Sequence, residues 1–143
     1  MIQTTKTVTE TQTLAAQLAA EYPNHKLWLL YGNLGAGKTT MIKGLASALG
    51  LPENQVKSPT FIFLADYGPL VHCDLYRLDK PEVDPMTLDM LSEYLDHGKH
   101  LVIEWPEKVE AIFSAVPHLK IQLDHLSDSE RTISVQSFPA SAN

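Results

Sequence analysis

Residues 26–40 read KLWLLYGNLGAGKTT, and this stretch decides the fold of the chain. Its first part, Lys26–Tyr31, is a short apolar run with the length of a buried strand. Its second part, Gly32–Thr39, fits the pattern G-x-x-x-x-G-K-[ST]. The next residues, Thr39–Leu49, repeat apolar side chains at helical spacing until Gly50 ends the helix. A strand, a glycine-rich loop and a helix in this order are what the motif requires, which disfavours a plain turn between two unrelated elements.

The loop predicts a site for ATP with Mg²⁺. Glycines let such a loop turn its backbone N–H groups inward, and these donors and the N-terminus of the following helix attract phosphate oxygens. The lysine reaches the β- and γ-phosphates, and the hydroxyl beside it coordinates Mg²⁺. No Asn-Lys-x-Asp segment of the guanine-reading kind is present, which disfavours a GTPase. The candidate residues of the loop are Asn33, Leu34, Gly35, Ala36, Gly37, Lys38, Thr39 and Thr40.

Two carboxylates are candidates for the chemistry, because phosphoryl transfer needs one group to hold the metal and often another to orient water. Glu104 closes the apolar run Leu101–Ile103, and Asp74 closes Leu70–Cys73. Carboxyl ends of sheet strands lie beside such a loop. We therefore expect Lys38, Asp74 and Glu104 to be catalytic, with the capping of a following helix as the alternative role for each carboxylate.

Two further polar residues each have two alternative roles. Thr60 follows the helix and either contacts Mg²⁺ and the γ-phosphate, as a switch segment does, or simply precedes a strand. His72 has no second histidine or cysteine at metal-ligand spacing nearby, so a packed strand histidine beside the site is favoured over a zinc ligand.

The remaining patterns complete an α/β sandwich with a mixed sheet. Thr7 and Glu10 form a capping box that opens a helix reaching about Ala20. The helix expected over Pro85–Leu95 should turn its apolar side chains toward the core; these are Met86, Leu88, Leu91 and Leu95. The other elements expected are a hairpin of Phe61–Tyr67 with Leu70–Cys73, a helix over Pro85–Leu95, a short helix over Glu107–Phe113, and a C-terminal hairpin of His118–Leu126 with Arg131–Phe138.

Bulk properties limit the classes of partner. We expect residues 1–143 to form a single domain. The formal net charge is −6 and the arginines are Arg77 and Arg131, which argues against direct gripping of a nucleic-acid backbone. Cys73 is the single cysteine, which fits a reducing cytoplasm, and no apolar stretch approaches the ~20 residues that span a bilayer.

Four segments together resemble one family, the bacterial tRNA threonylcarbamoyladenosine biosynthesis ATPase TsaE, also called YjeE. They are GNLGAGKTT at 32–40, KSPTF at 57–61, HCDLYRL at 72–78 and IEWPE at 103–107. The resemblance implies a P-loop NTPase-like three-layer sandwich and weak ATP hydrolysis by the protein alone. It also implies action with the partners TsaB and TsaD, which place threonylcarbamoyl on adenosine 37 of tRNAs that read ANN codons. Contact with tRNA would then be indirect, through the complex, and no membrane would be involved.

The resemblance also implies roles for individual residues. Thr39 and Glu104 match magnesium ligands, and Asp74 matches an aspartate thought essential for hydrolysis. Ser58 and Thr60 fall in a switch-like segment that contacts the nucleotide. Thr11 matches a threonine near the nucleotide in the first helix. Asn33 departs from the family, whose members often have Asp there; this position should face away from the phosphates, so we expect little consequence.

Two other functions are consistent with a phosphate loop. A small-molecule kinase would clamp its phosphoryl group with several arginines on a lid, and two arginines without an evident lid segment disfavour it. A nucleotide sensor would bind without hydrolysis and would need neither carboxylate as a catalyst. With only Arg77 and Arg131 available as arginine fingers, we expect slow basal turnover that partners raise.

Overall fold

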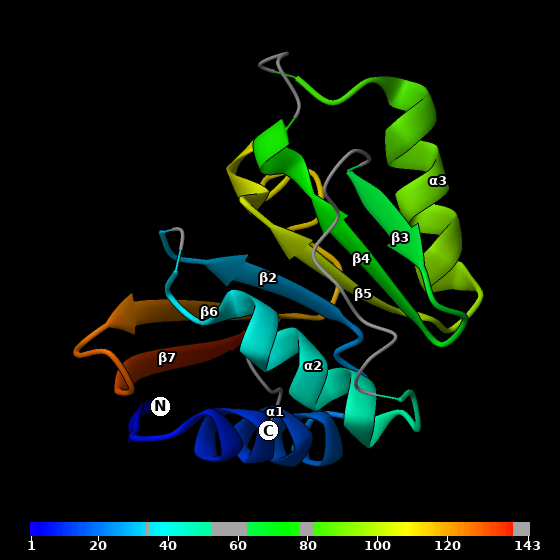
Figure 1. Ribbon diagram of the computed structural model, residues 1–143. Coiled ribbons are helices and arrows are strands. Elements are labelled where there is room, and N and C mark those ends of the chain that lie inside the picture. The colour runs from blue at the N-terminus through cyan, green and yellow to red at the C-terminus, as the bar shows by residue number, and fades with distance from the viewer. Residues whose placement is uncertain (34, 53–62, 78–81, 139–143) are drawn as a thin grey trace.

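The computed structural model describes residues 1–33, 35–52, 63–77 and 82–138, which form one seven-stranded sheet flanked by helices (Figure 1). The order of the strands across the sheet is β1-β7-β6-β2-β5-β4-β3. The strands are β1 (Ile2–Thr5), β2 (Leu27–Tyr31), β3 (Leu64–Asp66), β4 (Leu70–Asp74), β5 (His100–Glu104), β6 (His118–His125) and β7 (Arg131–Phe138). The helices are α1 (Val8–Glu21), α2 (Lys38–Ala48) and α3 (Pro85–Asp96), with 3₁₀ turns η2 (Leu75–Arg77) and η3 (Pro106–Lys108).

The middle of the sheet is parallel and its edges are antiparallel. Strands β6, β2, β5 and β4 run in the same direction, so their carboxyl ends share one edge of the sheet. The hairpin β3–β4, the hairpin β6–β7 and the pair β1–β7 are antiparallel. The mixed sheet and both hairpins are therefore confirmed, although residues 61–62 of the first hairpin lie outside the described ranges.

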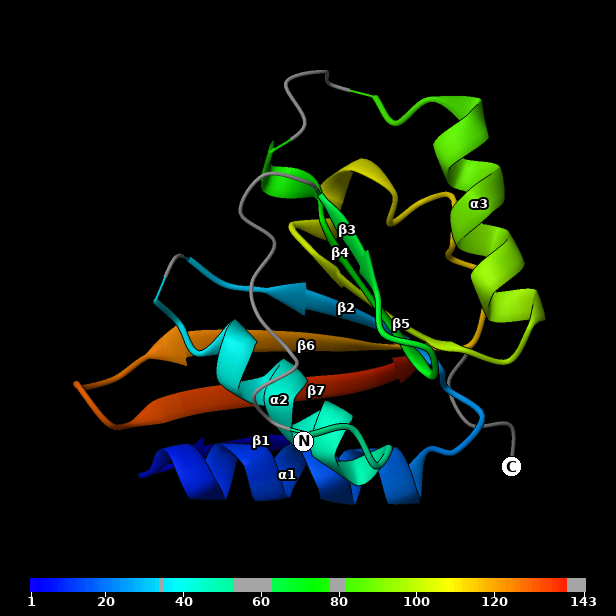
Figure 2. The same cartoon turned by 45° about the vertical axis from the view of Figure 1, so that its right-hand side comes forward.

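Alternation along β2 gives the sheet two buried faces. Trp28 and Leu30 pack in one core with residues of α1 and α2, whereas Leu27 and Leu29 pack in a second core with Leu91 of α3. Figure 2 shows α1 and α2 together on one side of the sheet and α3 on the other. The predicted three-layer α/β sandwich is confirmed.

The capping box opens α1 with one change. Thr7 is the N-cap, and its hydroxyl accepts the Glu10 N–H at 3.1 Å, as expected. The Glu10 carboxylate accepts the N–H of Lys6 at 3.2 Å, one residue earlier than the pattern prescribes. Both bonds satisfy donors at the start of the helix, which begins at Val8.

Two expected features are wrong in detail. Met86 is 82% exposed, because Leu88 and Leu91 define the buried stripe of α3 and Met86 stands about 200° from Leu88 around the helix. The segment Glu107–Phe113 is not a continuous α-helix. Its hydrogen bonds mix three- and four-residue spacings after η3, as in the bonds from the N–H groups of Val109 and Glu110 to the Pro106 carbonyl.

Strand β1 was not expected from the sequence. Only Thr5 of its four residues is buried, so the strand carries no apolar alternation and is fixed by backbone pairing with β7. None of the helices in the described ranges combines the length and apolar character that crossing a bilayer requires.

Candidate functional site

The loop between β2 and α2 has the backbone that its glycines predict. Gly32 has φ +146° and Gly37 has φ +100°, backbone conformations that residues other than glycine rarely adopt. A Cβ on Gly32 would stand 2.6 Å from the carbonyl oxygen of Leu123 in β6, so this position also needs glycine for space. The loop is thus seated directly against the neighbouring strand.

The first turn of α2 is arranged to receive an anion. Its N-cap is Gly37 in the left-handed conformation, and no side chain caps the helix. The N–H groups of a first turn lack partners within the helix, and the helix dipole places partial positive charge there. A phosphate group would satisfy these donors, so the backbone at this position fits the predicted ligand.

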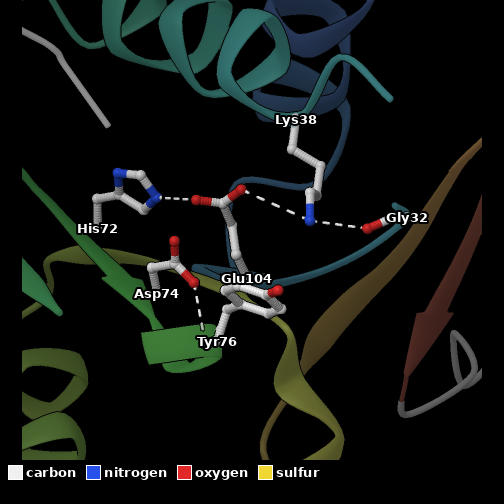
Figure 3. Close-up of polar contacts among 6 residues, drawn as sticks. All are labelled: Gly32, Lys38, His72, Asp74, Tyr76 and Glu104. Carbon is white, nitrogen blue, oxygen red and sulfur yellow. Dashed lines mark hydrogen bonds and ion pairs between the residues drawn. The ribbon is translucent and has the colours of Figure 1, made fainter. Parts of the chain in front are cut away.

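Lys38 is buried at 5% exposure, and its ammonium lies between the Gly32 carbonyl and the Glu104 carboxylate (Figure 3). Its Nζ donates to the Gly32 carbonyl at 2.7 Å and lies 3.8 Å from Glu104 Oε1. It also lies 4.2 Å from the ring centroid of Trp105. Burial lowers the pKa of Lys38, while the carboxylates of Glu104 and Asp74 oppose that shift.

Trp105 follows Glu104 with φ 54°, the single positive-φ residue other than glycine among the described residues. Such a backbone is unusual for a bulky side chain and costs about 1–3 kcal/mol, so it persists only where surrounding structure enforces it. The strained turn directs the indole under the Lys38 ammonium and against the Tyr76 ring, 4.9 Å between centroids.

The sheet brings the two predicted carboxylates together. Asp74 and Glu104 are register partners across β4 and β5, and Glu104 is also opposite Leu30 of β2. Both therefore stand at the carboxyl edge of the sheet, next to the loop that follows β2. Glu104 is 5% exposed and Asp74 is half-buried.

Each carboxylate has its own partner. His72 Nε2 lies 2.5 Å from Glu104 Oε2, whereas Asp74 Oδ1 accepts the N–H of Tyr76 at 3.0 Å. Burial raises the pKa of Asp74, and the charge of Glu104 adds to the rise, against the Tyr76 hydrogen bond and the charges of His72 and Lys38. A carboxylate with a raised pKa beside a phosphate loop is suited to accept a proton.

Among the described residues, no group of three or more His, Cys, Asp or Glu side chains is placed to hold a metal ion. Mg²⁺ in phosphoryl-transfer sites uses one or two protein carboxylates, phosphate oxygens and water rather than an all-protein cage. The Glu104 carboxylate at the sheet edge and the Thr39 hydroxyl in the first turn of α2 would supply oxygen donors of that type. The donor set therefore fits Mg²⁺ bound together with a nucleotide.

The remaining predicted residues fall in different places. Thr11 is buried and its hydroxyl lies 2.6 Å from that of Thr5. Thr11, Thr40 and Gly37 line one small cleft between α1, the loop and the β6–β7 turn. Asn33 is exposed, and its carbonyl accepts the Ala36 N–H at 3.0 Å. The predictions for Leu34, Ser58 and Thr60 concern residues outside the described ranges.

Two residues have contacts that the sequence did not indicate. His72, expected only to pack beside the site, lies against Glu104. Arg131, considered as an arginine finger, donates to the loop carbonyls of Ala36 and Gly35 at 3.0 and 3.2 Å. The single signal for Arg131 was its position directly after a hairpin turn, which does not reveal a contact 95 residues away.

Comparisons with known proteins identify relatives of this chain. The family model described as threonylcarbamoyl adenosine biosynthesis protein TsaE matches residues 5–133. Relatives carrying the name tRNA threonylcarbamoyladenosine biosynthesis protein TsaE include that of Bacillus subtilis, 36% identical over 129 residues (87% of this chain, 77% of the relative). That of Mycobacterium bovis is 34% identical over 145 residues (92% and 83%). That of Synechocystis is 38% identical over 98 residues, 65% of this chain, and the match spans 62% of that relative.

A solved structure is also similar. The crystal structure of Bacillus subtilis YdiB superposes with a TM-score of 0.69 at 28% sequence identity, covering 96% of this chain and 84% of that chain. The family match includes β2, the phosphate loop, α2, Asp74 and Glu104, the elements that build the site. On these findings the chain belongs to the TsaE family of threonylcarbamoyladenosine biosynthesis proteins.

Proposed function

We propose that this protein is a Mg²⁺-dependent ATPase that supports threonylcarbamoylation of adenosine 37 in tRNAs reading ANN codons. The observation that carries the ATPase part is the meeting of Lys38, Asp74 and Glu104 at one sheet edge beside the uncapped N-terminus of α2. The tRNA part comes from the printed names of the family and of the relatives.

The proposed reaction is hydrolysis of the γ-phosphoryl group. The loop N–H groups and Lys38 bind the phosphates and offset their charge. Water attacks the γ-phosphorus, the bond to the β–γ bridging oxygen breaks, and the Asp74 carboxylate accepts the proton from the water. The products are ADP and inorganic phosphate. Mg²⁺, held by Thr39 and Glu104, would supply positive charge at the β- and γ-oxygens.

We further propose that the protein acts with TsaB and TsaD in the cytoplasm, and that it contacts tRNA only through that complex. The net charge of −6 disfavours direct binding of an RNA backbone, so a partner would supply those contacts. Arg131 already donates to loop carbonyls, so a further cation at the γ-phosphate would come from elsewhere. An arginine supplied in trans raises turnover about 10³–10⁵-fold in other P-loop enzymes, which motivates the expectation of slow basal hydrolysis.

The test measures nucleotide binding and phosphate release. Titration calorimetry should show Mg²⁺-dependent ATP binding that Lys38→Ala and Thr39→Ala each abolish or severely weaken. Lys99→Ala is the control, because Lys99 is a lysine paired with Asp66 at the far edge of the sheet. Phosphate release should rise on addition of TsaB and TsaD. Magnesium-independent binding, or unchanged binding in both loop variants, contradicts the proposal.

A further inference from the structure

Arg131, the first residue of β7, forms five hydrogen bonds with the described residues, and each of these goes to a main-chain carbonyl. Two of them reach the phosphate loop, from Nε to the Ala36 carbonyl at 3.0 Å and from Nη2 to the Gly35 carbonyl at 3.2 Å. The others reach the β6–β7 turn, from Nη1 to the carbonyls of Ser127 at 2.7 Å, Glu130 at 2.9 Å and Asp128 at 3.5 Å. One guanidinium group thus joins the loop to the hairpin turn.

The direction of these bonds matters for the loop. The C=O and N–H of one peptide unit point in opposite directions because the unit is planar and trans. When Arg131 holds the Ala36 carbonyl on the outer side of the loop, the N–H of Gly37 in the same peptide unit points to the inner side. That inner side is where a phosphate loop presents its donors to the nucleotide.

The guanidinium also packs directly against the loop. A Cβ built on Gly37 would stand 3.3 Å from Arg131 Nε and 3.6 Å from its Cγ. Gly37 has φ +100° and serves as the N-cap of α2, so the contact is made at the residue where the loop becomes helix. Arg131 therefore contacts the loop at its left-handed N-cap residue and lines the same small cleft as Gly37 and Thr40.

Lysine cannot reproduce this arrangement. Arginine offers five N–H donors in a rigid planar fork, whereas an ammonium group offers three on a flexible stem. Bonding two loop carbonyls and three turn carbonyls from one side chain requires the wider, fixed spacing of the guanidinium. A purely electrostatic effect of the positive charge would, in contrast, survive replacement by lysine.

We propose that Arg131 is a positioning residue for nucleotide binding, which holds the carbonyls of Ala36 and Gly35 so that the Gly37 N–H faces the phosphates. This inference rests on the proposed function, since it assumes that the loop binds phosphate. If the loop adopts its binding geometry only a tenth of the time without Arg131, the apparent affinity falls about tenfold.

The experiment compares Arg131→Ala, Arg131→Lys and Ser127→Ala in the full chain. Ser127→Ala is the matched control, because it removes both hydrogen bonds of the Ser127 hydroxyl with Glu130 in the same turn, at 2.9 and 3.3 Å, and keeps every carbonyl that Arg131 contacts. Calorimetry with Mg²⁺-ADP and with a non-hydrolysable ATP analogue measures affinity. Amide NMR spectra of the nucleotide-free proteins report the environment of the Gly37 and Lys38 N–H groups, and thermal unfolding reports folding.

Both Arg131 variants should bind about tenfold more weakly and shift the Gly37 amide resonance, while Ser127→Ala stays within about twofold of wild type. Wild-type affinity in Arg131→Lys would show that charge suffices and would overturn the proposal. Equal weakening in Ser127→Ala would assign the effect to turn stability and overturn it too. If Arg131→Ala does not fold, Arg131→Lys, which keeps the alkyl stem, decides. If Lys38→Ala binds nucleotide with wild-type affinity, the proposed function fails. If Lys38→Ala loses nucleotide binding but both Arg131 variants keep wild-type affinity, this inference alone fails.

Discussion

The ion pair of Lys38 with Glu104 gives a prediction whose size follows from the structure. Their charged atoms are 3.8 Å apart and each residue is 5% exposed, so solvent screens the pair little. At an effective dielectric constant of about 20, charges at this separation attract by about 4 kcal/mol. The pKa of Lys38 is nevertheless lowered, which means that the loss of hydration outweighs this attraction.

We therefore expect Lys38 and Glu104 to stabilise each other, although burying both charges lowers the stability of the folded protein. In a double-mutant cycle of Lys38→Met, Glu104→Gln and the double variant, the coupling should be about 2–3 kcal/mol, below the Coulomb value because His72 and the Gly32 carbonyl remain as partners. The double variant should be at least as stable as the wild type, since it buries neither charge. Only its nucleotide binding should be lost.

Urea unfolding of the nucleotide-free protein at neutral pH measures the four free energies. The exposed pair Lys99 and Asp66 is the control, and its coupling should be at most about 1 kcal/mol. A coupling between Lys38 and Glu104 below about 0.5 kcal/mol would refute the reasoning, because it would mean that the two side chains do not hold each other in solution. A double variant much less stable than the wild type would refute the estimate of the desolvation cost.

Three further predictions concern the site and its support. Asp74→Asn should lower phosphate release by about 10²–10⁴-fold while calorimetry shows retained Mg²⁺-ADP binding; retained hydrolysis would exclude a catalytic role. Because the pKa of Asp74 is raised in the folded protein, ionisation of this carboxyl group destabilises the fold. Asp74→Asn should therefore be more stable than the wild type at neutral pH. Urea unfolding at a series of pH values should show the difference in free energy disappear as the pH falls through the raised pKa to the ordinary value of 3.8. Gly44→Ala should cost about 1–3 kcal/mol by thermal unfolding, because the new Cβ would stand 2.6 Å from backbone atoms of Gln12, whereas the exposed Ser47→Ala should be neutral.

The local part of the site was predictable from sequence because it depends on neighbours along the chain. Strand, glycine loop and helix follow one another in residues 27–48, and each carboxylate closes its own apolar strand. Parallel strands place their carboxyl ends at one edge, which puts Asp74 and Glu104 near the loop without knowledge of the exact strand order. Boundaries were correct within one or two residues where a turn or a cap marked them, as at Gly50 and Thr7.

The rest depended on register and long-range contact. His72 reaches Glu104 because it is opposite Val102, two residues before Glu104 on the adjacent strand, and such diagonal pairs are set by strand pairing alone. Arg131 meets the loop because β6 is adjacent to β2 and carries β7 with it, an order that no local pattern encodes. Strand β1 has too few buried side chains to leave an apolar signal.

The charges around the loop bear on why metal and nucleotide should bind as one unit. Lys38 is the one buried lysine or arginine among the described residues, and the carboxylates of Glu104, Asp74 and Glu107 all act on it. A triphosphate that enters without a metal would bring further negative charge next to these groups, and Lys38 would not offset it. A metal without nucleotide would find too few protein ligands among the described residues for a stable cage. Under the proposed function we therefore expect Mg²⁺ and ATP to bind together rather than either alone, so that ATP affinity depends steeply on Mg²⁺ concentration.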